Sequence, residues 1–322
     1  MEKFLSCDWG TTSFRLRLIG AENLAIIEEE NTKQGIAETF QSWKQSRKDE
    51  KNRTTFYLDI ILNHIKSIEE KCGSSLDDVP LIISGMASST IGMSELPYKN
   101  LPFSVSGKDL EISAIQASDA VKHKVIIISG VKTADDVMRG EETKLIGCAD
   151  VGNSYNDIYV FAGTHPKHVE VKNDEVIAFK TYMTGEFFEL LSKKSILAVS
   201  VKKDENIEAE NNLQSFLKGV SESVVSNLLH SSFLVRTNDV FKRYSLEENY
   251  FYLSGLLIGT ELKDLIVESR KITIVGSGGL SAQYVTALNG LGLSEKNAAV
   301  KSIDADEALI KGQLKIWKSY LV

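Results

Sequence analysis

The chain has 322 residues, of which 43% are hydrophobic and 25% charged, a composition typical of globular proteins and not of disordered ones. Its formal net charge of -7 argues against a general nucleic-acid binder, because no excess of lysine and arginine could displace phosphate counterions. No apolar run approaches the roughly 20 residues of a membrane-spanning helix, so we expect a soluble cytoplasmic protein that binds neither nucleic acid nor a membrane.

Three short antiparallel strands are predicted at the start of the chain, followed by helices that alternate with buried strands. The expected elements of this first half are strands at residues 3–7, 14–19 and 25–30, a helical region at 39–71, a strand at 80–85, a Gly- and Ser-rich loop at 86–92 and a strand at 125–130. The stretch before the last strand is less regular.

The second half of the chain repeats this order. Residues 157–182 read as three strands joined by a Gly-Thr-His turn and a polar turn. The later elements expected are helical patterns from residue 184, including 213–230 and 247–266, a strand at 272–278, a helix from 280, a strand at 298–303 and a closing helix from 304. The sequence therefore contains a weak internal repeat.

The repeat predicts the fold class. A three-stranded opening followed by helices and buried strands indicates an α/β fold of two duplicated domains, each a mixed sheet flanked by helices. We place the domains at residues 1–134 and 135–322, and the last helix is free to pack back on the first domain. Two such domains facing each other would enclose an interdomain cleft, the usual place for a ligand.

The stretch DWGTTS places an acidic residue at the end of an apolar strand, directly before a tight turn. Gly10 lets the backbone amides converge, and Thr11 and Thr12 add hydroxyl donors, a combination that suits phosphate oxygens. Asp8 would then hold Mg²⁺ through water, because magnesium prefers hard oxygen ligands and keeps much of its hydration shell. The alternative is a hairpin in which the aspartate caps the following amides.

Two further glycine turns lie in the second half. FAGTH places Gly163 and Thr164 between two strands, a second arrangement suited to phosphate. IVGSGGLS reads as a strand, a turn and a helix start, which allows close approach of a flat or phosphorylated ligand. Its glycines are Gly276, Gly278 and Gly279. Taken singly, each stretch is equally consistent with a simple tight turn.

The most charged functional candidate is the stretch DDVMRGEETKLIG, in which Arg139, Glu141 and Glu142 surround Gly140 at a predicted helix start. Acidic residues in a first helical turn complement the helix dipole, so a purely structural role is one interpretation. In the other, one glutamate accepts a proton from a sugar hydroxyl and the arginine holds an anionic group. The residues leave both open.

Five motifs occur along nearly the whole sequence, in the order DWGTTSFR, VMRGEETKLIG, GTHPKHV, MTGEFFELL and FYLSGLLIG. This set resembles the 2-dehydro-3-deoxygalactonokinase family, sugar-acid kinases of the actin, hexokinase and Hsp70 superfamily. The resemblance implies duplicated ribonuclease-H-like domains of the actin-like ATPase fold, with ATP and Mg²⁺ in the cleft. It also implies phosphorylation of 2-dehydro-3-deoxy-D-galactonate to its 6-phosphate, a step of galactonate catabolism.

The resemblance further implies a role for each motif. The metal ligand would be Asp8, the first phosphate motif Gly10, Thr11 and Thr12, the second phosphate motif Gly163 and Thr164, and the adenosine motif Gly276, Gly278 and Gly279. The acidic residue that the superfamily usually has before the second glycine turn is replaced here by Ala162, which leaves a metal role for that turn in question.

The catalytic and substrate-binding residues are less closely defined. The catalytic acid of related kinases precedes the second phosphate turn, as Glu141 and Glu142 do, and Asp136 remains an alternative. Arg139 acts with them, and Arg139 or Ser89 would engage the carboxylate of the sugar acid.

Two other functions stay open from the sequence. One is a kinase for a different sugar or sugar acid on the same fold. The other is an actin-like or Hsp70-like nucleotide switch that phosphorylates no small molecule. The expected partners are a sugar acid and ATP, and a homodimer is the oligomeric state that we keep as a hypothesis.

Overall fold

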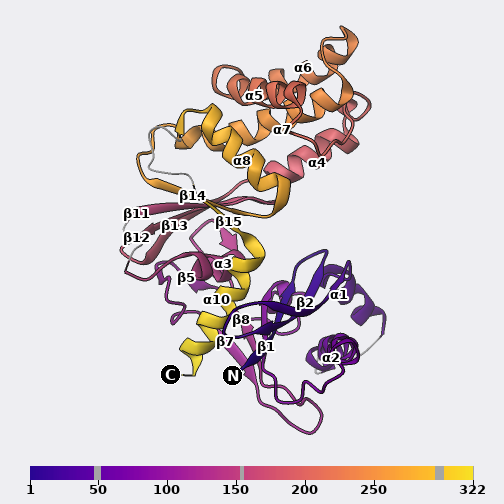
Figure 1. The fold of residues 1–322 in the computed structure, drawn as a ribbon, viewed down its shortest axis with the longest axis vertical. Coiled ribbons are helices and arrows are strands. Elements are labelled where there is room, and N and C mark those ends of the chain that lie inside the picture. Colours follow the sequence, from indigo (N-terminus) through magenta and orange to yellow (C-terminus); the bar gives the residue numbers. More distant parts are fainter. Residues whose placement is uncertain (47–51, 153–155, 294–300, 322) are drawn as a thin grey trace. The chain divides into compact units, whose positions relative to one another are not determined.

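The computed structural model describes residues 1–46, 52–152, 156–293 and 301–321, which form two compact units (Figure 1). Unit 1 comprises Met1–Tyr155, Lys172–Ala178 and Asp306–Val322, and unit 2 comprises Asn156–Val171 and Phe179–Ala305. The predicted domains follow the sequence repeat, whereas these units are defined by compactness. The division into residues 1–134 and 135–322 therefore stays a prediction.

Unit 1 is built on a six-stranded sheet in the order β3-β2-β1-β4-β8-β7. β1 pairs antiparallel with β2 and parallel with β4, and β4 pairs parallel with β8. The strands of this N-terminal sheet are β1 (Lys3–Trp9), β2 (Phe14–Gly20), β3 (Ile26–Thr32), β4 (Leu81–Gly85), β7 (Ile112–Ile115) and β8 (Val125–Ile128). β4 and β8 are buried along their whole length, as expected for strands covered on both faces.

Helices and a small second sheet complete unit 1. A three-stranded sheet has the order β10-β9-β5 and lies next to the charged stretch around Arg139 in the chain. The elements are β5 (Lys99–Asn100), β6 (Phe103–Ser104), β9 (Val131–Lys132), β10 (Val137–Met138), α1 (Ile36–Gln45), α2 (Arg53–Cys72), α3 (Glu141–Cys148) and α10 (Ala305–Tyr320). Apolar residues of β1, β2 and β4 pack with α2 in one core.

The second large sheet has the order β15-β14-β11-β12-β13-β6. β11 pairs parallel with β14, and β14 pairs parallel with β15. The strands of this C-terminal sheet are β11 (Asn156–Phe161), β12 (Lys167–Lys172), β13 (Glu175–Thr181), β14 (Lys271–Gly276) and β15 (Lys301–Asp304), with β6 joining through residues 175 and 176 of β13. Its helices in unit 2 are α4 (Thr184–Lys194), α5 (Glu210–Val225), α6 (Leu228–Val240), α7 (Leu246–Leu262) and α8 (Gly278–Gly290).

The two large sheets confirm the predicted repeat. The order β3-β2-β1-β4-β8 in the first sheet corresponds to β13-β12-β11-β14-β15 in the second. In both sheets the last two of these strands run parallel to the first strand of the repeat, β1 or β11. This order defines a duplicated ribonuclease-H-like fold, as the sequence predicted. The hydrophobic patterns of β4, β8 and β14 were informative because these parallel strands are largely buried.

Two predicted helices are divided in the structure. The pattern at residues 213–230 becomes α5 and α6, because the Asn227 side chain accepts a hydrogen bond from Leu229 N and starts a new helix. The region at 39–71 becomes α1 and α2, and residues 47–51 between them lie outside the described residues, as do residues 298–300 of the predicted last strand.

The last helix, α10, belongs to unit 1. Gln313 Nε2 donates hydrogen bonds to Cys7 O and to Ser84 Oγ, so α10 packs directly on β1 and β4. At its first turn, Asp306 forms ion pairs of 2.8 Å with Arg15 and 2.7 Å with Arg17. These contacts attach the end of the chain to the two strands that carry the first glycine turn.

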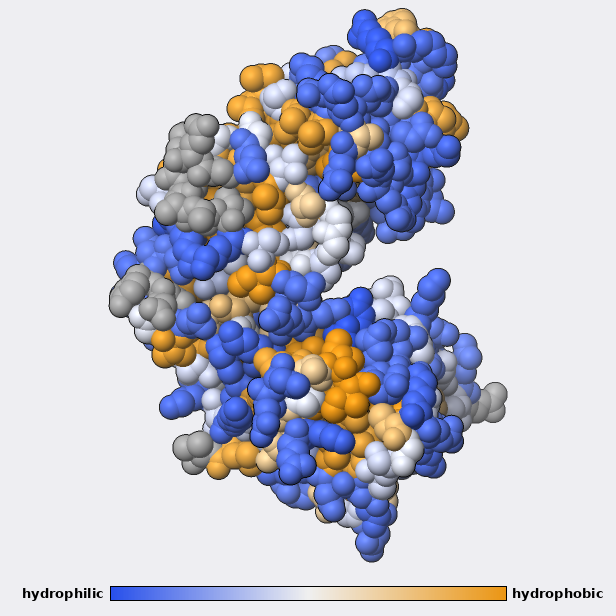
Figure 2. Space-filling view, in the orientation of Figure 1, coloured by the Kyte–Doolittle hydropathy of each residue, from blue (hydrophilic) through white to orange (hydrophobic). Residues whose placement is uncertain are grey.

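The surface in Figure 2 is mainly hydrophilic, with hydrophobic patches on both units. Among the described residues, no helix is both long and apolar enough to cross a membrane.

Candidate active site

The first glycine turn joins β1 to β2 and is held in a fixed shape. Gly10 N donates a hydrogen bond to Ser13 O at 2.9 Å, which closes the turn. The first turn of α1 supports it from behind, since Ile36 N donates to Gly10 O and Ala37 N donates to Thr11 O. The side chains of Thr11 and Thr12 are exposed, so both hydroxyls are available to a ligand.

Asp8 lies at the carboxyl end of β1, paired in register with Arg15 of β2 and Ser84 of β4. Its carboxylate is half-buried, and in the described part of the chain no group donates a hydrogen bond to it. The capping alternative therefore does not hold, because Gly10 N bonds to Ser13 O and not to the carboxylate. A half-buried carboxylate without a partner fits a hydrated Mg²⁺, which prefers such hard oxygen ligands.

The charged stretch at residues 139–142 lies close to the end of β1. Gly140 has a φ of 106°, a conformation that L side chains rarely adopt, and starts α3. A Cβ on Gly140 would lie 3.5 Å from Gly85 Cα, and one on Gly85 would lie 3.3 Å from Asp8 Oδ1. Gly85 thus lies between the two motifs, and the structure brings them together within unit 1.

Glu142 is completely buried at the start of α3. Both of its carboxylate oxygens accept hydrogen bonds from Gly140 N, at 2.9 and 2.7 Å, and Thr143 Oγ1 donates to one of them. Burial, and then the charge of Glu141, raise the pKa of Glu142 to about 7. This carboxylate faces its own helix start. Glu141 is less buried, and its Oε2 accepts a hydrogen bond from Arg139 N.

Arg139 is held by the turn that follows β4. Its Nη1 donates to Ser88 O at 2.6 Å and to Ser88 Oγ at 2.5 Å, and the guanidinium lies 4.2 Å from the Tyr98 ring centroid. Its Nε is buried without a hydrogen-bond partner among the described residues. Ser89 is 5% exposed and its hydroxyl donates to Met86 O, so this side chain is engaged within its own turn.

The second glycine turn joins β11 to β12 in unit 2 and lines a cavity of about 640 Å³. Gly279 at the start of α8 lines the same cavity, so the structure brings the second phosphate motif and part of the adenosine motif together. Gly276 and Gly278 instead line a neighbouring cavity of about 470 Å³, which includes Asp304. The predicted adenosine motif is thus divided between two cavities of unit 2.

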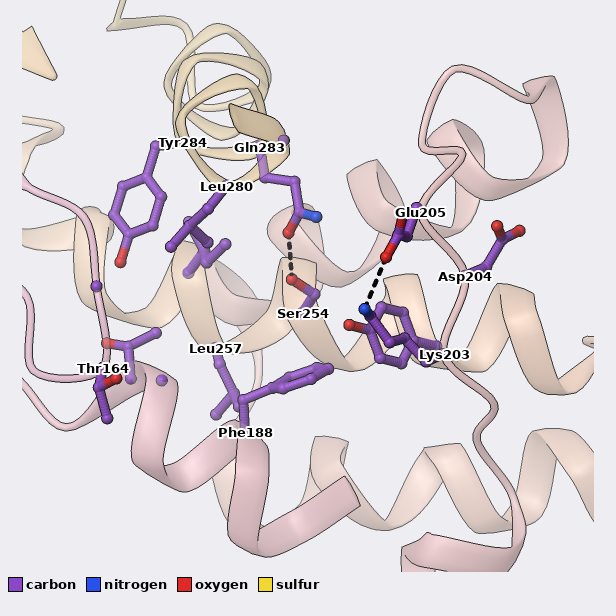
Figure 3. Close-up of a pocket in the computed structure, with 16 residues that line it drawn as sticks. Thr164, Phe188, Lys203, Asp204, Glu205, Ser254, Leu257, Leu280, Gln283 and Tyr284 are labelled. Carbon is purple, nitrogen blue, oxygen red and sulfur yellow. Dashed lines mark hydrogen bonds and ion pairs between the residues drawn. The ribbon is translucent and has the colours of Figure 1, made fainter. Parts of the chain in front are cut away.

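Figure 3 shows the side chains that the sequence analysis did not assign. The Ser254 hydroxyl donates a 2.6 Å hydrogen bond to Gln283 Oε1 within the cavity lining, and Lys203 forms an ion pair with Glu205. The other lining residues without a predicted role are Thr184, Gly185, Phe188, Asp204, Tyr250, Leu257, Ile258, Leu280 and Tyr284. Several belong to the motifs MTGEFFELL and FYLSGLLIG, whose recurrence in the family was the available signal.

The two histidines near the second turn form separate contacts. His165 Nε2 lies 2.6 Å from Glu186 Oε2, and His168 Nε2 lies 2.9 Å from Glu261 Oε1. His165 is half-exposed, whereas His168 and Glu261 are buried. Each histidine therefore hydrogen-bonds to a different glutamate.

The duplicated fold, the cavity beside the second glycine turn and the Asp8 carboxylate before the first one together fit a phosphotransferase of the actin-like ATPase fold. The profile of the 2-keto-3-deoxy-galactonokinase family matches residues 8–316. The chain belongs to this family and is a sugar-acid kinase.

Similar proteins agree with this assignment. A candidate 2-dehydro-3-deoxygalactonokinase of Rhizobium meliloti (strain 1021) is 31% identical over 96% of this chain and 94% of its own. The 2-dehydro-3-deoxygalactonokinase of Escherichia coli (strain K12) is 28% identical over 90% of each chain. A crystal structure of a candidate 2-dehydro-3-deoxygalactonokinase from Sinorhizobium meliloti has a TM-score of 0.77 at 29% identity, covering 96% of this chain and 94% of that one.

Proposed function

We propose that the protein transfers the terminal phosphoryl group of ATP to the 6-hydroxyl of 2-dehydro-3-deoxy-D-galactonate, in the cytoplasm and as a step of galactonate catabolism. The observation that carries this proposal is the cavity of about 640 Å³ that Gly163, Thr164 and Gly279 line together in unit 2. A glycine turn beside a cavity of this size suits the phosphates and the base of one nucleotide.

Unit 2 binds the nucleotide in this proposal. The amides of Gly163 and Thr164 contact phosphate oxygens, and Gly279 at the start of α8 leaves room for the adenosine. Phe188 and the Ser254–Gln283 pair also line the cavity and supply apolar and polar contacts for the base.

Unit 1 binds the sugar acid and the metal. Asp8 holds Mg²⁺, which supplies charge neutralisation to the phosphate oxygens when bound. Thr11 and Thr12 donate hydrogen bonds to the transferred phosphoryl group, and Gly10, whose N–H is bonded to Ser13 O, gives the turn its tight shape. Arg139, fixed by Ser88 and Tyr98, pairs with the substrate carboxylate, and Ser89 shapes the adjoining turn.

The general base in this proposal is Glu141. Glu142 is completely buried and accepts hydrogen bonds at both oxygens, so it positions the turn instead of touching the substrate. Glu141 accepts the proton of the 6-hydroxyl as that oxygen forms its bond to the γ-phosphorus. The bond between this phosphorus and the bridging oxygen breaks, and ADP leaves.

An assay that couples ADP release to a dye tests the reaction and the substrate together. We expect rapid ADP release with 2-dehydro-3-deoxygalactonate, much slower release with the epimer 2-dehydro-3-deoxygluconate, and little without a sugar acid. Equal rates with both epimers would indicate another sugar-acid kinase on the same fold. Slow ATP hydrolysis that ignores both compounds would indicate a nucleotide switch.

The homodimer remains a separate hypothesis. Sedimentation equilibrium at micromolar concentration tests it directly, because a monomer of this chain has a mass of 35.7 kDa.

A further inference from the structure

A buried carboxylate lies just outside the lining of the unit 2 cavity. Glu261, near the end of α7, has a side chain that is 1% exposed. Its Oε1 lies 2.9 Å from His168 Nε2, and its Oε2 accepts hydrogen bonds from the hydroxyls of Tyr284, at 2.7 Å, and Thr184. One carboxylate therefore connects α7 with β12, α4 and α8.

Two of these partners belong to the cavity itself. Thr184 and Tyr284 both line it, whereas Glu261 and His168 do not. In Figure 3 the hydroxyl end of Tyr284 points to the side of the cavity on which Thr164 lies. Burial, and then the negative charge of Glu261, raise the pKa of the Tyr284 hydroxyl, which keeps its proton available for donation.

Thr184 also connects Glu261 to the second glycine turn. The next residue, Gly185, packs so closely that a Cβ there would lie 2.7 Å from Gly163 O and 2.7 Å from Thr164 Cα. Glu186 N donates a hydrogen bond to Thr164 O at 3.2 Å. A displacement of the first turn of α4 would therefore move the turn that faces the phosphates.

A buried carboxylate is an expensive way to join helices, because removing a charge from water costs several kcal/mol unless donors surround it. An apolar side chain could fill the same space. Hydrogen bonds to the carboxylate are directional, whereas an apolar contact is not. They fix the orientations of the Thr184 and Tyr284 hydroxyls.

We propose that Glu261 is a positioning residue of the nucleotide site, which sets Thr184 and Tyr284, and through them the Gly163–Thr164 turn, in the geometry that ATP requires. This inference rests on the proposed function in one respect, the binding of ATP to the unit 2 cavity.

The test compares Glu261→Gln with Glu170→Gln. Glu170 lies on β12 like His168, but its 2.5 Å ion pair with Arg270 involves no residue of the cavity. We expect Glu261→Gln to raise the ATP Kd and the ATP KM about tenfold, with the sugar-acid KM unchanged, because small misplacements of binding groups weaken the contacts they make. Glu170→Gln should leave all three unchanged even if it lowers Tm.

A double variant tests the route through α4. If Glu261 acts through Thr184, Glu261→Gln combined with Thr184→Val should raise the ATP Kd no more than the larger single effect. Should Glu261→Gln not fold, Thr184→Val and Tyr284→Phe take its place, each expected to raise the ATP Kd alone.

Several results would overturn the inference. For folded Glu261→Gln, these are an unchanged ATP Kd or an equal rise of the ATP and sugar-acid KM values. Fully additive effects on the ATP Kd in the double variant would also overturn it. If Glu261→Gln does not fold, an unchanged ATP Kd in both Thr184→Val and Tyr284→Phe would do so. Calorimetric titration of the wild type with ATP distinguishes a failure of this inference from a failure of the proposed function. Binding of ATP without phosphorylation of the sugar acid contradicts only the proposed function, whereas no binding of ATP overturns both.

Discussion

The two glycine turns are built alike and differ at one chemically decisive position. Each joins the first two strands of a repeat, and each is packed against a glycine at a helix start. A Cβ on Gly35 would lie 2.3 Å from Thr11 O, and one on Gly185 would lie 2.7 Å from Gly163 O. Two residues before the turn glycine, however, the first turn has Asp8 and the second has Phe161, which is 4% exposed.

This difference predicts that the two halves of the duplicated fold have different tasks. Both turns have a backbone shape that suits phosphate, and the first adds the exposed hydroxyls of Thr11 and Thr12. Only the first turn has a carboxylate that could bind a cation, while the second has an apolar side chain within the sheet. We infer that the metal belongs to unit 1 and that unit 2 binds the nucleotide without a metal ligand from its own turn.

The largest effect is expected from Asp8→Asn. Loss of the charge that holds Mg²⁺ should lower kcat on the order of a thousandfold, because charge neutralisation in the transition state depends on it. Thermal unfolding should be unchanged, since no described group bonds to this carboxylate. Near-normal turnover of a folded Asp8→Asn protein would remove this residue from the mechanism. It would also contradict the inference that the first turn differs from the second by binding the metal.

A pH dependence of stability is expected from Glu142. Its pKa is raised from 4.5 to about 7, so between these values the folded protein keeps a proton that the unfolded chain has lost. Stability is therefore greatest below this window, falls as pH rises through it and changes no further above it. Relative to Glu142→Gln, the wild type should lose about 2.5 kcal/mol of unfolding free energy between about pH 5 and pH 8.

Urea denaturation of both proteins across this pH range measures the difference. Parallel profiles for the wild type and Glu142→Gln would show that folding does not raise the pKa of this glutamate.

Arg139→Ala sharpens the assignment of the sugar acid to unit 1. Removing a fixed guanidinium from a carboxylate should raise the sugar-acid KM about a hundredfold with a small change in the ATP KM. Arg236→Ala, in unit 2 and paired with Asp239, is the matched control and should alter neither. Comparable increases of both KM values in Arg139→Ala would point to a structural arginine.

Gly163→Ala tests the second turn and should have the smallest effect. No atom lies within 4 Å of a Cβ at this position, so the fold tolerates the methyl group. The methyl would occupy space that the phosphates need, and the ATP KM should rise about tenfold while the sugar-acid KM stays constant. Steady-state kinetics with each substrate varied in turn decides this, and an unchanged ATP KM would exclude phosphate contact at the turn.

Sequence reasoning located both turns, the repeat and the charged stretch, because each depends on local pattern. Alternation of apolar residues predicted the strands, and glycine followed by threonine marked the turns. It did not reveal Gly35 or Gly185, whose importance comes from close packing against backbone far away in the chain. It also joined α5 and α6, since a single capping asparagine divides an otherwise continuous helical pattern.

The sequence by itself predicted the strands along the chain, the two glycine turns and the family, since these follow from short contiguous motifs. Only the tertiary structure decided which of two adjacent glutamates is buried, and which glycines share a cavity with Gly163. It also brought Glu261 to Thr184 and Tyr284. Burial and long-range hydrogen bonds depend on packing between elements, and no local pattern of residues specifies that packing.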